Sequence, residues 1–292
     1  MLKGVYTAII TPFKKDGSID WDALEKLVGF QIKNKIAGIV PCGTTGESPT
    51  LSHDEHDKVI EKVIDWANGK CTVIAGTGSN ATSEAIRLSK HAADAGADAL
   101  LIVNPYYNKP TQEGLYRHFK AVADSVDKDI VVYNIKGRTG VNVETSTLMR
   151  IVKDCKNVTA VKEASGDLNQ MKDVISKRPT YFSVLSGDDG ITLDLIKAGG
   201  NGIISVASNM IPDKMVKMVD AALRKDYSTA EKLNKEMVPF FEGEFIETNP
   251  IPIKAALAMK GMCQEIYRLP MCELRPENRA KWKKMLEDMK LL

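Results

Sequence analysis

The feature that most constrains the fold is a regular alternation of short apolar segments with longer amphipathic ones. The apolar segments are almost continuously hydrophobic, which is typical of strands buried on both faces of a parallel sheet. Eight are expected as strands: Val5–Ile10, Gly38–Cys42, Thr72–Ala75, Ala99–Val103, Ile130–Tyr133, Thr159–Lys162, Tyr181–Leu185 and Gly202–Val206. Helices are expected between them, including Trp21–Lys35, His53–Trp66, Thr82–Ala95, Gln112–Ser125 and Leu193–Ala198. Ser52 and Thr111 stand immediately before two of these helices, where N-terminal caps are expected.

Strand–helix units repeated in this way predict a (β/α)8 barrel, with an open doubly wound sheet as the alternative. After the last strand candidate the β pattern stops, and the remaining segments read as helices: Ala230–Phe241, Ile253–Gly261 and Pro276–Leu292. We therefore expect a catalytic TIM barrel over residues 1–224. Residues 225–292 should form a small C-terminal all-helical domain packed on the barrel.

The composition of the 292 residues argues against several classes of protein. A hydrophobic share of 43%, a charged share of 27% and a net charge of +2 are those of an ordinary globular protein. We expect no nucleic-acid partner and no membrane association, because neither a basic cluster nor an apolar run of spanning length is present. The five cysteines are scattered without a Cys-x-x-Cys pair, and no signal-peptide pattern is visible, which favours a cytoplasmic location.

Lys162 is an unusual residue for its position, because it ends the apolar run that begins at Val158. Burial disfavours the charged form of an amine. A neutral amine can attack a ketone and form a Schiff base, which turns the bound substrate into an electron sink. The alternative is a strand-end lysine whose amine reaches solvent.

Two other strand ends carry groups suited to binding a carboxylate. Thr44 and Thr45, within Gly43–Glu47, offer amide and hydroxyl donors, although a plain glycine-rich turn would look the same. Arg138 follows the fifth strand candidate on a loop bracketed by glycines, and its guanidinium can hold a carboxylate with two parallel hydrogen bonds.

Tyrosines follow or end two of the strand candidates. Tyr133 ends the fifth and could shuttle a proton, or could be a core residue with its hydroxyl at the rim. Tyr106 and Tyr107 lie between prolines on a stiff loop, where they could serve the site or fill an interface. Asp188 and Asp189 are best interpreted as an acidic pair at a helix N-terminus, so we expect no metal and no other cofactor.

Together these segments resemble the dihydrodipicolinate synthase family of class I Schiff-base lyases and aldolases. The matching motifs are GTTGE at 43–47, NPYYNKPTQEG at 104–114, YNIKGRTG at 133–140, VKEASG at 161–166, SGDD at 186–189, GGNGIISV at 199–206 and TNPIPIKAAL at 248–257. One departure is Lys136, where the family usually has proline, and we expect a tolerated loop change there.

The resemblance implies a reaction and a role for each matching residue. Pyruvate would form an imine on Lys162, and its enamine would attack L-aspartate 4-semialdehyde to give 4-hydroxy-tetrahydrodipicolinate for lysine biosynthesis through diaminopimelate. Thr44, Thr45, Gly187 and Ile204 would surround pyruvate, and Arg138 would bind the second substrate. Tyr133, Thr44 and Tyr107 would relay protons, with Tyr107 supplied by the neighbouring subunit of a homotetramer. The alternative is a related sugar-acid or sialic acid aldolase.

The resemblance also implies feedback inhibition by L-lysine. The positions that bind the inhibitor in the family are matched by Ser48, His53, His56, Asn80, Glu84 and Tyr106. Asn80 and Glu84 are spaced one helical turn apart, as are His53 and His56, and a carboxylate at Glu84 suits an ammonium group. Solvated helix positions are the alternative for these residues, and an HxxH metal site is a third interpretation.

Overall fold

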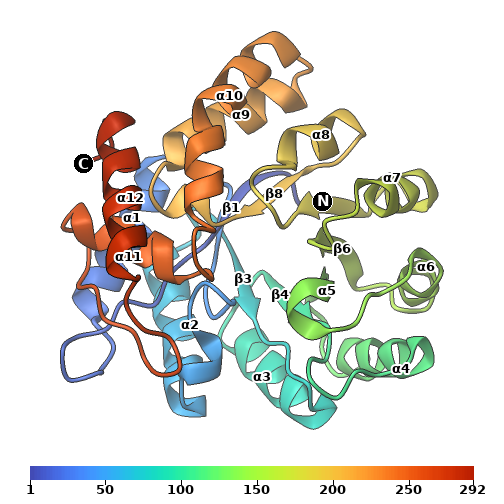
Figure 1. Cartoon of the computed structure of the whole chain (residues 1–292). Coiled ribbons are helices and arrows are strands. Elements are labelled where there is room, and N and C mark those ends of the chain that lie inside the picture. Colours follow the sequence, from blue (N-terminus) through green and yellow to red (C-terminus); the bar gives the residue numbers. More distant parts are fainter.

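The computed structural model covers residues 1–292 and forms a closed barrel (Figure 1). The strands pair in parallel in chain order, and β8 closes on β1. They are β1 (Gly4–Ala8), β2 (Gly38–Val40), β3 (Thr72–Gly76), β4 (Ala99–Val103), β5 (Asp129–Asn134), β6 (Val158–Glu163), β7 (Ser183–Ser186) and β8 (Gly202–Ser205). The predicted barrel is confirmed and the open sheet is wrong. The sequence pattern misplaced most strand ends by one or two residues. Apolar loop residues such as Ile9 and Val206 lengthened some predicted strands, whereas β5 and β6 extend into the polar residues Asn134 and Glu163.

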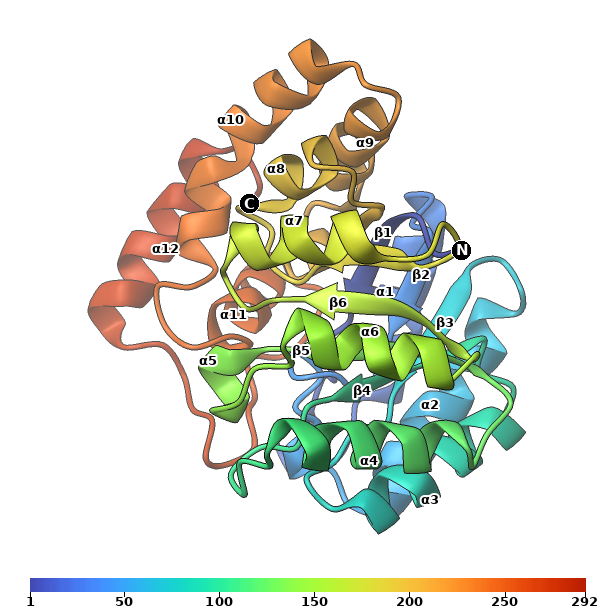
Figure 2. The ribbon, with the colours of Figure 1, turned by 90° about the vertical axis from the view of Figure 1, so that its right-hand side faces the viewer.

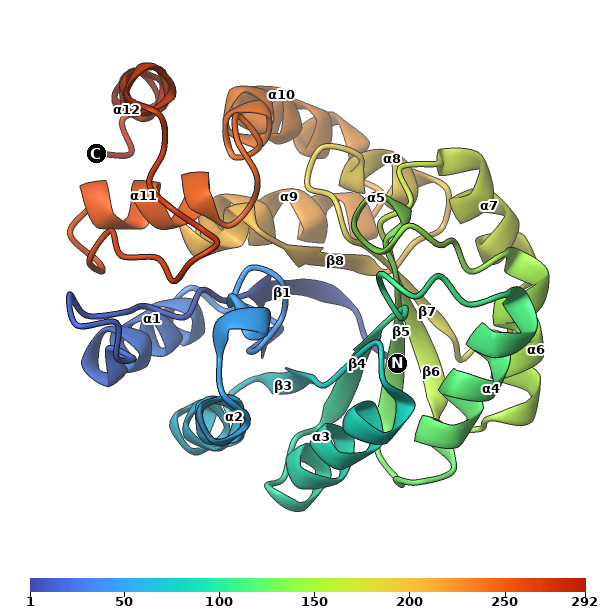
Figure 3. The ribbon, with the colours of Figure 1, turned by 60° about the horizontal axis from the view of Figure 1, so that its bottom comes forward.

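Helices surround the barrel, as the view in Figure 3 shows. They are α1 (Trp21–Lys33), α2 (His53–Ala67), α3 (Thr82–Asp94), α4 (Gln112–Ala123), α5 (Lys136–Thr139), α6 (Thr145–Asp154), α7 (Leu168–Lys177), α8 (Thr192–Lys197) and α9 (Pro212–Leu223), with short 3-10 helices η1 (Ser48–Thr50) and η2 (Ala207–Asn209). Both predicted caps are present. Ser52 and Glu55 form a reciprocal capping box, and the side chain of Thr111 accepts from Gly114 N.

Hydrophobic side chains fill the interior of the barrel and also form a layer outside it. Tyr6, Ala160 and Ile204 belong to a buried cluster in the barrel interior. The larger cluster lies between the strands and the surrounding helices. Since side chains alternate between the faces of a strand, Lys162 points inward with Ala160, and Glu163 points outward.

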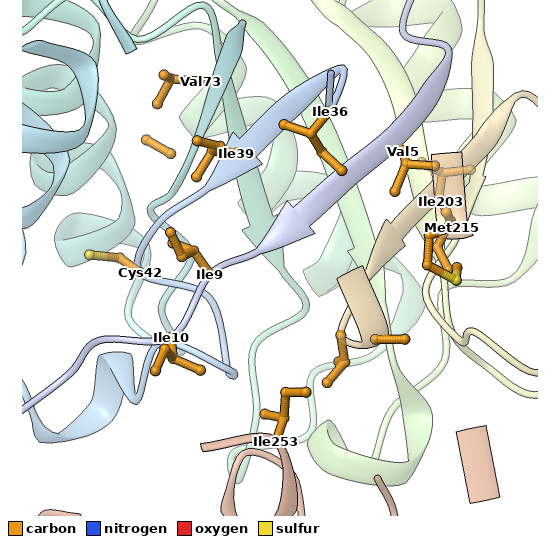
Figure 4. Close-up of a cluster of buried hydrophobic side chains, with 14 of the residues drawn as sticks. Val5, Ile9, Ile10, Ile36, Ile39, Cys42, Val73, Ile203, Met215 and Ile253 are labelled. Atoms are coloured by element: carbon orange, nitrogen blue, oxygen red, sulfur yellow. The ribbon is translucent and has the colours of Figure 1, made fainter. Parts of the chain in front are cut away.

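The chain after α9 is helical, as expected, and shares its core with the barrel. Its helices are α10 (Tyr227–Gly243), α11 (Ile251–Met259) and α12 (Pro276–Asp288). Ile253 of α11 belongs to the same hydrophobic cluster as Val5 and Ile9 beside β1 (Figure 4). In Figure 2 the arrowhead of β6 points toward the side on which α5 and α11 lie. The segment therefore packs near the carboxyl ends of the strands, where barrel chemistry takes place.

No helix in the chain combines the length and the apolar character needed to cross a membrane.

Candidate active site

Lys162 and Tyr133 lie side by side in the barrel interior. The register of β5 and β6 pairs them directly, and the Nζ atom of Lys162 lies 4.1 Å from the centre of the Tyr133 ring. Both residues are buried, at 6% and 5% exposure. None of the ion pairs in the chain involves Lys162, so its amine is held near a phenol without a neutralising carboxylate. This is an arrangement in which the amine is available as a nucleophile.

Gly187 leaves the space that the Lys162 side chain occupies. A Cβ atom built on Gly187 would lie 2.9 Å from Cε of Lys162 and 2.6 Å from Cβ of Ala164. Any larger residue would displace the lysine, so this predicted site residue borders Lys162 directly. Ile204 is fully buried in the same interior cluster as Tyr133.

Glu163 is a residue whose role the sequence interpretation missed. It is fully buried and accepts hydrogen bonds from Asn134 Nδ2 at 3.1 Å, Ser165 N at 2.8 Å and Gln170 Nε2 at 3.4 Å. Burial raises the pKa of Glu163, and these donors oppose the shift. The network ties the end of β6 to β5 and α7 and so fixes the strand that carries Lys162. A charged residue next to Lys162 in a buried strand was the available signal.

A single cavity of about 490 Å³ brings together two sets of predicted residues. From the catalytic and substrate set it is lined by Thr44, Tyr133 and Arg138. From the inhibitor set it is lined by Ser48, His53, His56, Glu84 and Tyr106. Lys162, Thr45, Gly187 and Ile204 do not line it, so the cavity joins the inhibitor set to part of the catalytic and substrate set within one subunit. No group of three or more His, Cys, Asp or Glu side chains is arranged to hold a metal ion.

Thr45 and Arg138 are joined by a residue from outside the barrel. The buried Thr45 Oγ1 accepts from Asn249 Nδ2 at 3.0 Å. Arg138 Nη2 donates to the main-chain oxygen of Asn249, also at 3.0 Å. Asn249 lies in TNPIPIKAAL, but nothing in that motif says which side chains it contacts.

His53 and Glu84 form the polar end of the cavity. His53 Nε2 lies 2.7 Å from Glu84 Oε1, and the hydroxyl of Ser79 also donates to Glu84. The hydrogen bonds from Ser79 and then His53 hold the pKa of Glu84 below its usual value. Glu84 is thus kept as a carboxylate able to receive a cation.

His56 and Asn80 differ in how they meet the cavity. Burial lowers the pKa of His56, whose Nε2 hydrogen-bonds to Gly76 O at 2.9 Å, while Nδ1 has no hydrogen-bond partner and lies 3.8 Å from Asp57 Oδ1. Asn80 does not line the cavity, and its main-chain oxygen accepts from Asn108 Nδ2. The expected helical spacing of Asn80 and Glu84 is wrong, because α3 begins only at Thr82.

Tyr107 and Lys136 are both exposed on loops that follow barrel strands. Tyr107 is 89% exposed, with a φ of 72°, and does not line the cavity. A single chain therefore does not bring Tyr107 together with Tyr133 and Thr44. Lys136 is exposed at the first position of α5. Proline is well accommodated at that position of a helix, so lysine and proline suit the same backbone.

Asp189 serves a different helix from the one that follows it in sequence. It is buried and accepts from Ser205 Oγ at 2.6 Å and Val206 N at 2.9 Å, at the start of η2. The two aspartates interpreted as an acidic pair at a helix N-terminus thus lie at two helices: Asp189 meets amides at the start of η2, and Asp188 Oδ1 accepts from Gly190 N just before α8, which begins at Thr192. A short sequence cannot show which distant amides a carboxylate meets.

The sequence of the whole chain agrees with this site. A model of the dihydrodipicolinate synthetase family matches residues 1–289. The chain belongs to this family. The family resemblance seen in the motifs is thereby confirmed over almost the full length. The chain is 52% identical over 292 residues to the 4-hydroxy-tetrahydrodipicolinate synthase of Koribacter versatilis, covering 100% of this chain and 97% of that protein.

Solved structures of the dihydrodipicolinate synthetase family share the fold closely. A dihydrodipicolinate synthase from Acinetobacter baumannii, complexed with pyruvate, is 42% identical, with a TM-score of 0.98 and full coverage of both chains. The enzyme from Cyanidioschyzon merolae with lysine bound is 38% identical, with a TM-score of 0.97 and 99% coverage of each chain. A variant described as monomeric is 41% identical, with a TM-score of 0.97, and covers 100% of this chain and 98% of its own.

Proposed function

We propose that this chain is a Schiff-base lyase that condenses pyruvate with L-aspartate 4-semialdehyde to give 4-hydroxy-tetrahydrodipicolinate. The observation that carries the proposal is the pairing of Lys162 with Tyr133 inside the barrel, an amine without a carboxylate partner beside a phenol. Relatives at about half identity over the whole chain carry the corresponding name. The reaction supplies an early intermediate for lysine biosynthesis.

Lys162 supplies the nucleophile. Its neutral amine attacks the ketone carbon of pyruvate, and loss of water leaves the imine. The imine withdraws electrons, so the methyl group of pyruvate loses a proton and becomes the terminal carbon of an enamine. That carbon attacks the aldehyde of the second substrate, whose oxygen takes up a proton. The substrate amine then attacks the imine carbon, which closes the ring and releases Lys162.

The protons in these steps need a group that can both give and accept them. Tyr133 lies beside Lys162, and Thr44 lines the same cavity as Tyr133. We propose that Tyr107 of a second copy completes the relay. The exposed position of its ring on a projecting loop supports this arrangement. A dimer that exchanges Tyr107 is the minimum assembly, and a dimer of dimers is our expectation.

Two anionic substrates need two carboxylate sites. Thr44 and Thr45, with Gly187 and Ile204 nearby, serve pyruvate beside Lys162. Arg138 lines the cavity and serves the carboxylate of L-aspartate 4-semialdehyde. The alternative activity, a sugar-acid or sialic acid aldolase, is not favoured by the names of the relatives or by Arg138 within Gly-Arg-Thr-Gly.

We propose that L-lysine inhibits the enzyme by binding where His53 and Glu84 line the cavity. Glu84 is suited to the ammonium of the inhibitor, and the cavity is continuous with Thr44 and Tyr133. L-lysine bound there would lie close to Thr44 and Tyr133 and could disturb the proposed proton relay. The related enzyme from Cyanidioschyzon merolae has lysine bound, which supports this use of the cavity.

We assign residues 1–224 to the catalytic barrel and residues 225–292 to a C-terminal helical domain that closes one side of it. The shared hydrophobic cluster between Ile253 and the β1 region supports close packing rather than flexible attachment. The scattered cysteines, all free, fit our expectation of a cytoplasmic location.

The reaction can be tested by following condensation of pyruvate with L-aspartate 4-semialdehyde, with and without millimolar L-lysine. Turnover that lysine suppresses would support both the catalytic and the inhibitory proposals. Turnover that lysine does not affect would support the catalytic proposal and contradict the proposal that lysine inhibits the enzyme. Absence of turnover, together with cleavage of a sialic acid, would support the aldolase instead.

A further inference from the structure

Asn249 sits between the two carboxylate sites although it belongs to neither the barrel strands nor their loops. It lies in the turn between α10 and α11, and only 5% of it is exposed. Its side chain reaches Thr45 and its main-chain oxygen reaches Arg138, each at 3.0 Å. One residue of the C-terminal segment therefore contacts a side chain from each of two distant barrel loops.

The direction of the hydrogen bond to Thr45 determines what Thr45 can do. Asn249 Nδ2 is the donor, so Thr45 Oγ1 is the acceptor. A hydroxyl that already accepts still has its own hydrogen to donate. Thr45 makes no other side-chain hydrogen bond within the chain and is 2% exposed, so that hydrogen is left for a bound ligand.

The amide oxygen of Asn249 argues against a purely structural role. Oδ1 is buried and has no hydrogen-bond partner. A buried acceptor left without a partner costs folding free energy, and a residue selected only for stability would avoid that cost. Such groups are found where the site, rather than the fold, requires the side chain.

We propose that Asn249 is a positioning residue that fixes the Thr45 hydroxyl as a donor toward the pyruvate carboxylate. Through its main chain it also restrains the Arg138 guanidinium. The inference rests on the proposed function, because it takes Thr45 to be part of the pyruvate site. It assigns the C-terminal helical segment a direct part in substrate binding, which the barrel alone would lack.

The test is the pyruvate concentration that gives half-maximal borohydride trapping on the enzyme, measured without the second substrate. In Asn249→Ala we expect this concentration to rise about tenfold, because a hydrogen bond to a charged group loses its alignment. The KM for L-aspartate 4-semialdehyde at saturating pyruvate should change less than twofold, because the main-chain contact to Arg138 persists. Thr248→Ala is the matched control, since that exposed side chain lies in the same turn, and it should behave as wild type.

A double variant separates positioning from general damage. If Asn249 acts through Thr45, Asn249→Ala added to Thr45→Val should raise the half-maximal pyruvate concentration no further than Thr45→Val alone. Equal effects on both substrates, or additive effects in the double variant, would overturn the inference. An unchanged pyruvate requirement in Asn249→Ala would overturn it as well. Failure of the wild-type enzyme to trap pyruvate would instead overturn the proposed function, and this inference with it.

Discussion

Lys162 and Lys254 are two buried lysines in one chain with opposite surroundings. Each amine lies over an aromatic ring, with Lys162 Nζ 4.1 Å from the centre of Tyr133 and Lys254 Nζ 4.3 Å from that of Phe13. Both side chains are almost inaccessible to solvent, with 6% and 0% of the residue exposed. The difference is that Lys254 forms an ion pair with Glu47 and Lys162 has no carboxylate partner.

Lys254 links the C-terminal helices to the barrel. Its amine donates to Glu47 and to Ile266 O, and Arg268 N donates to the second oxygen of Glu47. Burial lowers the pKa of Lys254, and the carboxylate of Glu47 opposes the shift. Glu47 ends the loop that carries Thr44 and Thr45 and has a left-handed backbone, with a φ of 52°. The ion pair therefore holds a functional loop against α11.

The comparison shows that burial alone does not make a lysine reactive. An amine paired with a buried carboxylate is held in place, so Lys254 acts as a structural contact. An unpaired amine beside a phenol is free to attack a carbonyl group, as we propose for Lys162. The predictions below test this difference, beginning with the largest effect.

Replacement of Lys162 should remove the chemistry and leave the fold. Lys162→Arg keeps a long cationic side chain but cannot form an imine, so we expect activity to fall by about a thousandfold or more. Mass spectrometry after borohydride reduction with pyruvate should show an adduct on the wild-type enzyme and none on the variant. An adduct found on Lys254 in either protein would show that the contrast between the two lysines is wrong.

Replacement of Lys254 should affect stability first. Lys254→Met leaves Glu47 as an unpaired buried carboxylate, so we expect a loss of about 3–5 kcal/mol in the free energy of unfolding. Urea denaturation should also show that Glu47→Gln added to Lys254→Met restores most of this loss, because both charges are then absent. If the single variant is as stable as the wild-type protein, the ion pair does not anchor α11. The folded variants should still trap pyruvate on Lys162.

Removal of the Tyr133 hydroxyl should show whether the ring beside Lys162 has a chemical role that the Phe13 ring beside Lys254 lacks. Tyr133→Phe gives Lys162 the same kind of ring that Lys254 has, and we expect kcat to fall by about a hundredfold through loss of proton transfer. Tyr6→Phe is the matched control, because Tyr6 on β1 belongs to the same interior cluster as Tyr133 and its hydroxyl accepts from Lys3 N, just before the strand. Its kcat should equal that of the wild-type enzyme. An unchanged kcat in Tyr133→Phe would remove Tyr133 from the relay.

The smallest effect concerns Arg268, whose main chain hydrogen-bonds to Glu47, the partner of Lys254. Arg268 pairs with Glu55 at 2.6 Å, and its hydrogen bonds lower the pKa of Glu55 to about 2 from the usual 4.5. A lowered carboxyl pKa stabilises the folded state above pH 4.5, and that contribution is lost as the pH falls toward 2. The pair is partly solvated, so we expect about 1 kcal/mol or less.

Denaturation curves of the wild-type protein and Glu55→Gln, compared between pH 6 and pH 3, would measure this contribution. The stability difference between the two proteins should shrink as the pH is lowered. A difference that stays constant over this range would mean that the charge of Glu55 does not contribute.

The sequence by itself determined the barrel and the place of its strand-end residues, such as Lys162 and Tyr133, in the fold. Runs such as Thr159–Lys162 are local signals, because a short, almost unbroken apolar segment between amphipathic helices is typical of a strand buried on both faces. Once the barrel is given, side-chain alternation places Lys162 in the interior, and parallel pairing puts every strand end on one face. The fold class and the interior position of Lys162 were therefore predictable from short segments.

Only the tertiary structure shows which distant residues contact one another at that face of the barrel. In the sequence Lys254 only interrupts an apolar helix. In the structure it pairs with Glu47, which is 207 residues away along the chain. Asn249 and Thr45 are 204 residues apart, and no local periodicity records their hydrogen bond. Partners of this kind are set by the packing of the C-terminal helices on the barrel. A buried polar group can be satisfied by any correctly placed donor or acceptor, so sequence spacing carries no sign of which one is chosen.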